Sequence, residues 1–443
     1  MVRWQPRVHM RKGGGDAGAF GQSSATGAQC HRAVYGASLQ RVWARWSAGD
    51  VVNLQLLGQR IAVLYKTLAI LTLNAIVIFV CLDFAARVTY KAHSSLFPPS
   101  AQSDPRASSP FYRSQPWAAQ YWREFLLSRQ TRYHSFVLYR RAPFKGETIN
   151  IDQEGIRLTP GADCSPHAFK VFAFGPSTMW GTGSPDWGTI PSYLQTGITK
   201  LRNGPICVVN FGESGYMSTQ SVIELMLQLQ SGHIPDVTLF FDGVADVYTA
   251  YQSGRAGVHE NFGQIAAKLE RRGVPKPGPL LELLESSSLH SLVASLVTKL
   301  RQEVPSTPKL LTYETMGIDA ESLSNAVIQT YLSNYKIVNG LAQKYGFKSF
   351  FFWPPFITMG EKPLTAEEWE LKRSLDPALA KLYLSVYRKI ERLIPECEML
   401  IYLGAIYDDY KPLLWLDESH VTPVGNELIA QKMIEVLRAR SVF

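Results

Sequence analysis

The segment FKVFAFGPST (169–178) decides the fold class of this chain. A short, mainly apolar run is followed at once by glycine, proline and two hydroxyl residues. Such a run is typical of a strand buried on both faces of a parallel sheet, and the Gly-Pro pair marks its end. Runs of the same kind recur downstream: ICVVN (206–210), VTLFFD (237–242), KSFFFW (348–353) and MLIYL (399–403).

Amphipathic helical patterns lie between and after these runs. The candidate helices span 189–203, 218–230, 280–303, 322–345, 365–395 and 423–439, and a Gly/Pro-rich loop covers 271–279. Strands that alternate with helices predict an α/β fold, with a parallel five-stranded sheet between two helical layers. We expect this three-layer α/β/α sandwich to occupy residues 166–443 and to bind ligands beyond the carboxyl ends of its strands.

The basic character of the chain lies at its N-terminus. The formal charge is +8, and residues 1–66 hold nine Lys and Arg against two acids, so the rest of the chain is nearly neutral. A nucleic-acid-binding domain carries its basic residues on the domain itself, so we expect no nucleic-acid partner.

The basic tail is followed by the apolar run TLAILTLNAIVIFVCL (67–82), which is long enough to span a bilayer if it extends back to Ile61. The positive-inside rule then places the N-terminus in the cytoplasm and the later residues outside. We predict a cytoplasmic tail (1–60) and one transmembrane helix (61–85). A buried core helix and a cleaved signal peptide are the alternatives.

Residues 86–165 are predicted to be a tether and a lead-in segment. Ser and Pro are frequent over 92–118, which is typical of an extended tether. Of the five cysteines, the exported part would hold Cys164, Cys207 and Cys397, and three cysteines cannot all pair. The sequence lacks a CxxC pair and an HExxH motif, so we predict no metal and no cofactor.

Chemically active residues follow the predicted strands. Ser177 comes just after the first strand, where a helix start would surround its hydroxyl with free backbone N–H groups. Near the C-terminus stands Asp417-Glu418-Ser419-His420. His420 can take the Ser177 proton as a general base, and Asp417 can orient its imidazole if the segment turns back on itself.

These two segments, with NFGESG (210–215) after the second strand and DGVAD (242–246) after the third, resemble the SGNH (GDSL-type) hydrolase family in their order along the chain. Residues 139–144, 150–152 and 155–157 are similar to the lead-in of membrane-anchored bacterial relatives. The resemblance implies that Ser177 is the nucleophile, that Asp417 and His420 complete the triad, and that the amides of Ser177 and Gly215 bind the oxyanion.

Alternatives remain open at several of these positions. Gly212 competes with Gly215 but fits the tight turn after the strand better. Ser214 is a rival nucleophile, although its surroundings lack the Gly-x-Ser-x-Gly elbow. Candidate substrate-binding residues are Trp180, Tyr216 and Asp246, each of which also fits a structural role: buried packing for the two aromatics and a turn cap for Asp246.

Two departures from the family pattern bear on activity. Pro176 precedes the serine where the family has Asp or Gly, which stiffens the turn without removing a catalytic group. Ala245 replaces the Asn whose side-chain amide helps to bind the oxyanion. Loss of one such donor typically lowers turnover by about 10²–10³.

The leading hypothesis is a membrane-anchored SGNH-type serine esterase of the bacterial inner membrane, with its C-terminal domain in the periplasm or otherwise outside the cytoplasm. By resemblance, its substrates are acyl esters such as O-acetyl groups on envelope or exported polysaccharide. The alternatives are a catalytically impaired SGNH domain that binds glycan or partners in an envelope assembly, and an O-acyltransferase.

Overall fold

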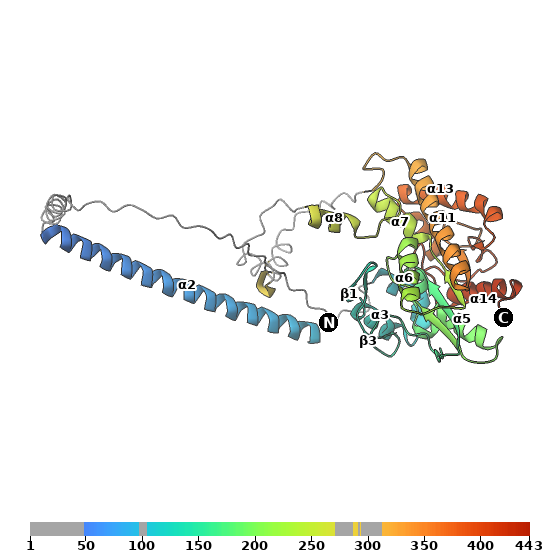
Figure 1. Cartoon of the computed structure of the whole chain (residues 1–443), viewed down its shortest axis with the longest axis horizontal. Helices are drawn as coiled ribbons and strands as arrows, with labels where there is room; N and C mark the ends of the chain where they lie inside the picture. Colours follow the sequence, from blue (N-terminus) through green and yellow to red (C-terminus); the bar gives the residue numbers. More distant parts are fainter. Residues whose placement is uncertain (1–47, 97–103, 271–286, 291–292, 294–311) are drawn as a thin grey trace, which may run out of the picture. The chain divides into compact units, whose positions relative to one another are not determined.

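The structure, a computed structural model, describes residues 48–96, 104–270, 287–290, 293 and 312–443 (Figure 1). It consists of two units, Met1–Ala85 and Ala86–Phe443. Most of the predicted tail (1–60), the loop 271–279 and most of the candidate helix 280–303 lie outside the described residues.

One long helix, α2 (Ala48–Leu96), contains the predicted transmembrane segment. Its stretch Asn53–Thr89 has a mean hydropathy of 2.4, and it is the single helix among the described residues that is long and apolar enough to cross a membrane. The large apolar side chains of this stretch are exposed. An exposed apolar surface of this length favours a lipid environment.

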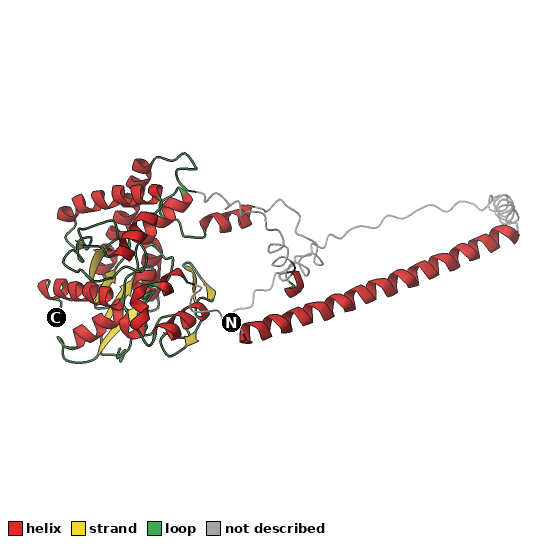
Figure 2. Cartoon of the chain, turned by 180° about the vertical axis from the view of Figure 1, so that it is seen from behind, coloured by secondary structure: helices red, strands yellow, loops and turns green. Residues whose placement is uncertain are grey.

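A five-stranded parallel sheet forms the centre of the second unit (Figure 2). Its strands are β5 (Phe169–Phe174), β6 (Ile206–Asn210), β7 (Val237–Phe240), β8 (Lys348–Trp353) and β9 (Leu400–Tyr402). Their order is β6-β5-β7-β8-β9, and β5 pairs with β6 on one side and with β7 on the other. The five strands predicted from the apolar runs are therefore confirmed.

Helices cover both faces of the sheet. One face packs against α6 (Ser218–Gln230), α7 (Val244–Ser253), α11 (Ala320–Tyr345) and α13 (Pro377–Leu393), and the other packs against α5 (Ile190–Thr199) and α14 (Pro423–Ala439). Along β8 the side chains alternate between the two cores, because successive residues of a strand point to opposite faces. The predicted three-layer sandwich is confirmed.

The candidate helix 365–395 is two helices, α12 (Ala366–Ser374) and α13. Proline lacks an N–H and clashes with the preceding turn, so Pro377 ends one helix and begins the next. The Asp376 side chain accepts hydrogen bonds from the amides of Ala378 and Leu379, which fixes the new start. The shorter elements include α8 (Phe262–Glu270), η4 (Asp186–Gly188) and η5 (Ile394–Glu396).

The lead-in segment is folded against the sandwich. It contains η2 (Pro105–Ser108), η3 (Pro110–Ser114), α3 (Ala118–Leu127) and two small antiparallel pairs, β1 (Thr131–His134) with β2 (Leu138–Arg141) and β3 (Phe144–Lys145) with β4 (Asn150–Ile151). The extended tether predicted over 92–118 is wrong where the structure describes it. Residues 92–96 continue α2, and residues 104–118 form short helices because Tyr112 and Trp117 pack with the aromatic residues of α3.

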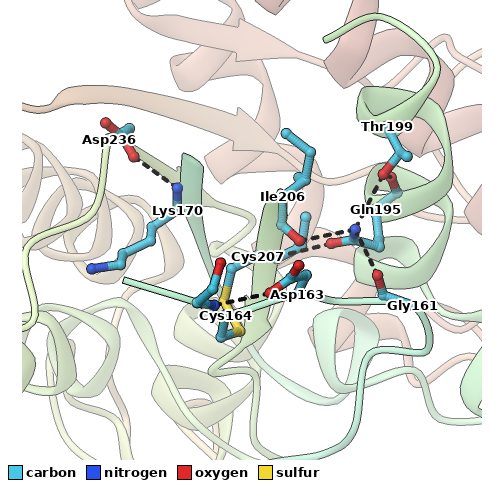
Figure 3. Close-up of a disulfide and its surroundings, with 11 residues drawn as sticks. Gly161, Asp163, Cys164, Lys170, Gln195, Thr199, Ile206, Cys207 and Asp236 are labelled. Atoms are coloured by element: carbon cyan, nitrogen blue, oxygen red, sulfur yellow. Dashed lines mark hydrogen bonds between the residues drawn. A yellow bond between two sulfur atoms is a disulfide. The ribbon is translucent and has the colours of Figure 1, made fainter. Parts of the chain in front are cut away.

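A disulfide between Cys164 and Cys207 joins the end of the lead-in to the edge strand β6 (Figure 3). Beside it, the Gln195 side chain bonds to Ile206 O at 3.1 Å and accepts from Val208 N at 3.0 Å. Asp163 N also donates to Ile206 O, at 2.8 Å. These contacts cover an edge that would otherwise offer unpaired backbone groups to another strand. Cys397 is free.

Candidate active site

Ser177 stands at the point where β5 gives way to the short helix α4 (Ser177–Trp180). The turn between them, Gly175-Pro176, needs glycine at its first position. Gly175 has φ 157°, and a Cβ atom there would lie 2.9 Å from the carbonyl oxygen of Phe241. The strand end and this tight turn present Ser177 at the carboxyl edge of the sheet.

The structure brings Ser177, His420 and Asp417 together although they are far apart in the sequence. His420 Nε2 lies 2.7 Å from Ser177 Oγ, and His420 Nδ1 lies 2.7 Å from Asp417 Oδ2. The Asp417–His420 segment turns back on itself, since Leu416 N donates to His420 O at 2.8 Å. With Nδ1–H donating to Asp417, Nε2 is free to accept the Ser177 proton.

Asp417 is held in its charged form. Burial acts to raise its pKa, but the His420 imidazole and the Arg106 guanidinium outweigh burial and hold the pKa of Asp417 well below its usual range. The neighbouring Glu418 behaves in the opposite way, because burial and the charge of Asp417 both raise its pKa. The carboxylate beside His420 is thus the one that stays ionised.

Ser177 and His420 line a cavity of about 440 Å³. Gly215, Ala245, Ser214 and Glu260 also line it. Gly215 has φ 78°, and a Cβ atom there would lie 2.7 Å from Tyr139 Oη, so both the backbone and the space favour glycine.

Two backbone amides at this cavity are free. Within the described ranges, neither Ser177 N nor Gly215 N donates to a protein acceptor. The amide of Gly212, the alternative donor, instead bonds to Asn210 Oδ1 at 3.0 Å within its own turn. The free Gly215 amide therefore fits the oxyanion prediction better than the Gly212 amide does.

The three predicted substrate-binding residues are buried and do not line the cavity, so the structure gives this prediction no support. Trp180 and Tyr216 are 0% and 1% exposed, and Tyr216 Oη donates to the carbonyl of Tyr139. Asp246 is 3% exposed and accepts the Ser218 amide at 3.1 Å, so it holds the start of α6. Periodicity cannot separate a buried aromatic from an exposed one at a strand end, and here the lead-in covers both aromatics.

Ser214, the rival nucleophile, lacks an adjacent base. Its hydroxyl accepts a hydrogen bond from Arg141 Nη2 at 2.8 Å, and no histidine contacts it in the described part of the chain. Ala245 is 9% exposed and lines the cavity. Position 245, where the predicted pattern has an Asn amide, therefore faces the same space as Ser177 but offers no side-chain donor.

Three arginines support the site, and no sequence motif predicts a role for any of them. Arg141 and Arg157 stack on the Trp180 ring, with their guanidinium carbons 3.9 and 4.2 Å from its centroid. Both lie in the segments 139–144 and 155–157 of the predicted lead-in pattern, which was the available signal. Arg106 lies in the predicted tether, where nothing in the pattern marked it.

The described residues contain no group of three or more His, Cys, Asp or Glu side chains placed to hold a metal ion. No protein-family model matches the chain, and no curated protein matches it.

Solved structures with a similar fold include an acetyl xylan esterase, with 18% identity and a TM-score of 0.35 over 60% of this chain and 99% of that chain. Another is a member of the lipolytic G-D-S-L family from Veillonella parvula DSM 2008, with 11% identity and a TM-score of 0.31 over 61% and 99%. A third is a lipase from a goat rumen metagenome, with 11% identity and a TM-score of 0.32 over 60% and 97%. These identities and scores are too low to indicate a function for this chain.

Proposed function

We propose that this chain is a serine ester hydrolase that works through a covalent acyl-enzyme. The observation that carries the proposal is the continuous set of contacts from Ser177 Oγ through His420 to Asp417, with 2.7 Å at each step. A nucleophile in contact with a base, and a base oriented by a carboxylate, is the arrangement that activates a serine hydroxyl.

In the first half-reaction Ser177 Oγ bonds to the ester carbonyl carbon while its proton passes to His420 Nε2. The resulting oxyanion accepts hydrogen bonds from the amides of Ser177 and Gly215. The carbon–oxygen bond of the ester then breaks, and the leaving alcohol takes the proton from His420. In the second half-reaction water gives a proton to His420 Nε2 and its oxygen bonds to the acyl carbon; the bond between that carbon and Ser177 Oγ then breaks, Oγ takes the proton back from His420, and the carboxylic acid leaves.

The substrate class we propose is an O-acylated carbohydrate. Beyond the nucleophile, the cavity is lined by Arg129, Tyr248, Glu260 and Glu418, whose side chains can bond to sugar hydroxyls. Burial raises the pKa of Glu260, and burial together with the charge of Asp417 raises the pKa of Glu418. A polyol matches such a mixed lining better than an alkyl chain does.

We place the domain outside the cytoplasm of a bacterial cell, anchored in the inner membrane by α2. The basic tail before α2 and the Cys164–Cys207 disulfide support this orientation, because disulfides persist in oxidising compartments. Protease treatment of spheroplasts tests it. The C-terminal domain should be degraded while the tail is protected, and the reverse pattern would contradict the orientation.

The activity is tested with the full-length protein in detergent, by hydrolysis of an aryl acetate and by acetate release from an acetylated polysaccharide. Wild type should turn over both substrates, Ser177→Ala and His420→Ala should abolish turnover, and Ser214→Ala should retain it. Thermal unfolding of each variant controls for folding. Turnover that survives Ser177→Ala, or that depends on Ser214, would contradict the proposal.

Ala245 favours one second candidate, a glycan-binding domain with little or no catalytic activity. In that case folded wild type would bind acetylated polysaccharide without releasing acetate. An O-acyltransferase would share the acyl-enzyme step, and added sugar acceptors would then divert the acyl group from water. Product analysis of the same reaction separates these three outcomes.

A further inference from the structure

Arg106 lies beside the catalytic set although it belongs to the segment that precedes the sandwich. It stands in η2, soon after α2 ends at Leu96. Its Nη1 atom is 3.3 Å from Asp417 Oδ2 and 3.4 Å from His420 Nδ1. An arginine from the lead-in therefore contacts the two residues that activate Ser177.

The guanidinium is fixed in place by its own segment. Arg106 Nε donates to Asp104 Oδ1 at 2.9 Å and Nη2 donates to Asp104 Oδ2 at 2.8 Å, which is a two-pronged ion pair. Its carbon lies 5.5 Å from the centroid of the Phe125 ring and 5.8 Å from that of Trp122, both in α3. With two N–H directions fixed by Asp104 and one face resting on aromatic rings, Nη1 points toward Asp417.

The two oxygens of Asp417 are held by different parts of the chain. Oδ1 accepts the backbone amides of His420 at 2.7 Å and Ser419 at 2.9 Å, both from the same loop. Oδ2, which is the closer oxygen to His420 Nδ1, has Arg106 as its other partner among the described residues. His420 Nδ1 lies 2.9 Å from Oδ1 as well, so the lead-in positions one of the two oxygens that orient the imidazole.

We propose that Arg106 is a positioning residue that holds the Asp417 carboxylate in line with His420, so that the segment after the membrane helix completes the active site. The inference rests on the proposed esterase function. Lysine cannot replace arginine fully here, because a single ammonium group cannot bind Asp104 with two parallel bonds and Asp417 with a third.

Removal of the Arg106 cation should shift the pH dependence of activity in one direction. A fixed positive charge makes nearby groups release protons more readily, so its loss moves the low-pH limb of activity to higher pH. The other titratable and charged groups that act on Asp417 and Arg106 come from the surrounding elements: Asp104 from the start of η2, Tyr112 from η3, Tyr121 from α3, Tyr248 from α7, and Glu418 and His420 from the loop of Asp417.

The experiment measures the rate at which a fluorophosphonate labels Ser177 in the full-length protein, from pH 5 to pH 9. Arg106→Met should lower the plateau rate by about tenfold, as expected for one lost hydrogen bond to a charged group, and should move the low-pH limb upward by about 0.5 pH unit. Arg106→Lys should lower the rate less and leave the limb in place. Arg113→Met, which replaces an exposed arginine of the same segment, should match wild type.

The outcomes separate this inference from the function on which it rests. If Ser177→Ala abolishes labelling but Arg106→Met labels like wild type at every pH, the inference is overturned and the esterase proposal stands. A lower rate with an unmoved limb would also overturn it, since that result indicates structural damage alone. If Arg106→Met does not fold, Arg106→Lys tests the inference in its place. Labelling of Arg106→Lys at the wild-type rate would then contradict the need for an arginine that binds Asp104 and Asp417 together. If folded wild type is not labelled, both proposals fail.

Discussion

Arg157→Met tests how the nucleophile helix is held in place. Arg157 is 1% exposed, and its Nη1 donates to the carbonyls of Trp180 at 3.0 Å and Gly181 at 2.9 Å, at the end of α4. Its Nη2 donates to Ser184 O at 2.7 Å, and its Nε donates to Asp186 Oδ1 at 2.9 Å. Methionine fills a similar volume but can make none of these hydrogen bonds.

The expected effect follows from the partners left behind. Asp186 would keep the Asn150 amide at 3.0 Å but lose its buried cation. Removing one partner of a buried ion pair lowers stability by about 3–5 kcal/mol. We expect a loss of about 4 kcal/mol, which for a domain of this size lowers the Tm by roughly 5 °C. Since α4 carries Ser177, the rate of fluorophosphonate labelling should fall as well.

The loss of stability in Arg157→Met should grow as the pH rises. In wild type, burial already raises the pKa of Asp186 more than Arg157 lowers it, and removal of Arg157 raises that pKa further. A carboxyl whose pKa is higher in the folded state makes stability fall as pH rises from the unfolded value, near 4, through the folded value. The difference between wild type and Arg157→Met should therefore be smaller at pH 4.5 than at pH 7.

Thermal unfolding followed by tryptophan fluorescence, at both pH values, measures this effect. Arg157→Met with Asp186→Asn should recover part of the loss, because it removes the orphaned charge. Arg113→Met is the matched exposed control and should unfold like wild type. A loss below about 1 kcal/mol, or a loss that is the same at both pH values, would refute the reasoning from the buried pair.

Three further predictions concern the cavity and the disulfide. Asp417→Asn should lower aryl-ester turnover by about 10⁴-fold, because the imidazole loses its orienting charge; a loss below tenfold would count against its place in the triad. Ala245→Asn should raise turnover by about tenfold, which is less than the 10²–10³ that one preorganised donor supplies, and an unchanged or lower rate would contradict the oxyanion assignment. Cys164→Ser with Cys207→Ser opens a loop closed across 43 residues and should lower stability by about 4 kcal/mol, or roughly 5 °C in Tm. Turnover of that double variant at 25 °C should stay within twofold of wild type, because the disulfide lies outside the cavity, and a larger change in kcat would show coupling to the site.

The central sheet could be predicted because its strands are buried on both faces. Short, mostly continuous apolar runs such as those at 169–174 and 348–353 can satisfy both helical layers at once, so the pattern and the fold agree. The ends of the helices were harder to predict from the sequence. The pattern over 365–395 is amphipathic throughout, and the break at Pro377 was the local signal that the prediction passed over.

The residues of the candidate site that belong to sequence motifs could be predicted from the order of those motifs along the chain. The residues whose place depends on how the lead-in packs on the sandwich could not. Ser177, Asp417 and His420 follow strand ends or stand near the C-terminus in a recognisable order, and the structure brings them into contact. Trp180 follows a strand end too, but it is covered by α3 and by two arginine side chains. That cover comes from the lead-in, whose path over the sandwich no periodicity reveals.

Arg106 is the clearest example of a site residue that the sequence pattern does not predict. The Ser and Pro content of 92–118 indicates an extended chain when read locally, yet Asp104 and Arg106 form an ion pair that reaches the active site. Only tertiary packing of aromatic residues turns this segment into part of the domain. A domain boundary drawn from the sequence at residue 166 separates Arg106 from Asp417, although the two side chains touch.

The most direct test of the central claim is to react the full-length wild-type protein with a fluorophosphonate and to locate the adduct by peptide mass spectrometry. The account predicts one phosphonyl group on Ser177, and no adduct after Ser177→Ala or His420→Ala in folded protein. An adduct on another serine, such as Ser214, or no adduct on folded wild type, would contradict the assignment of Ser177 as the nucleophile.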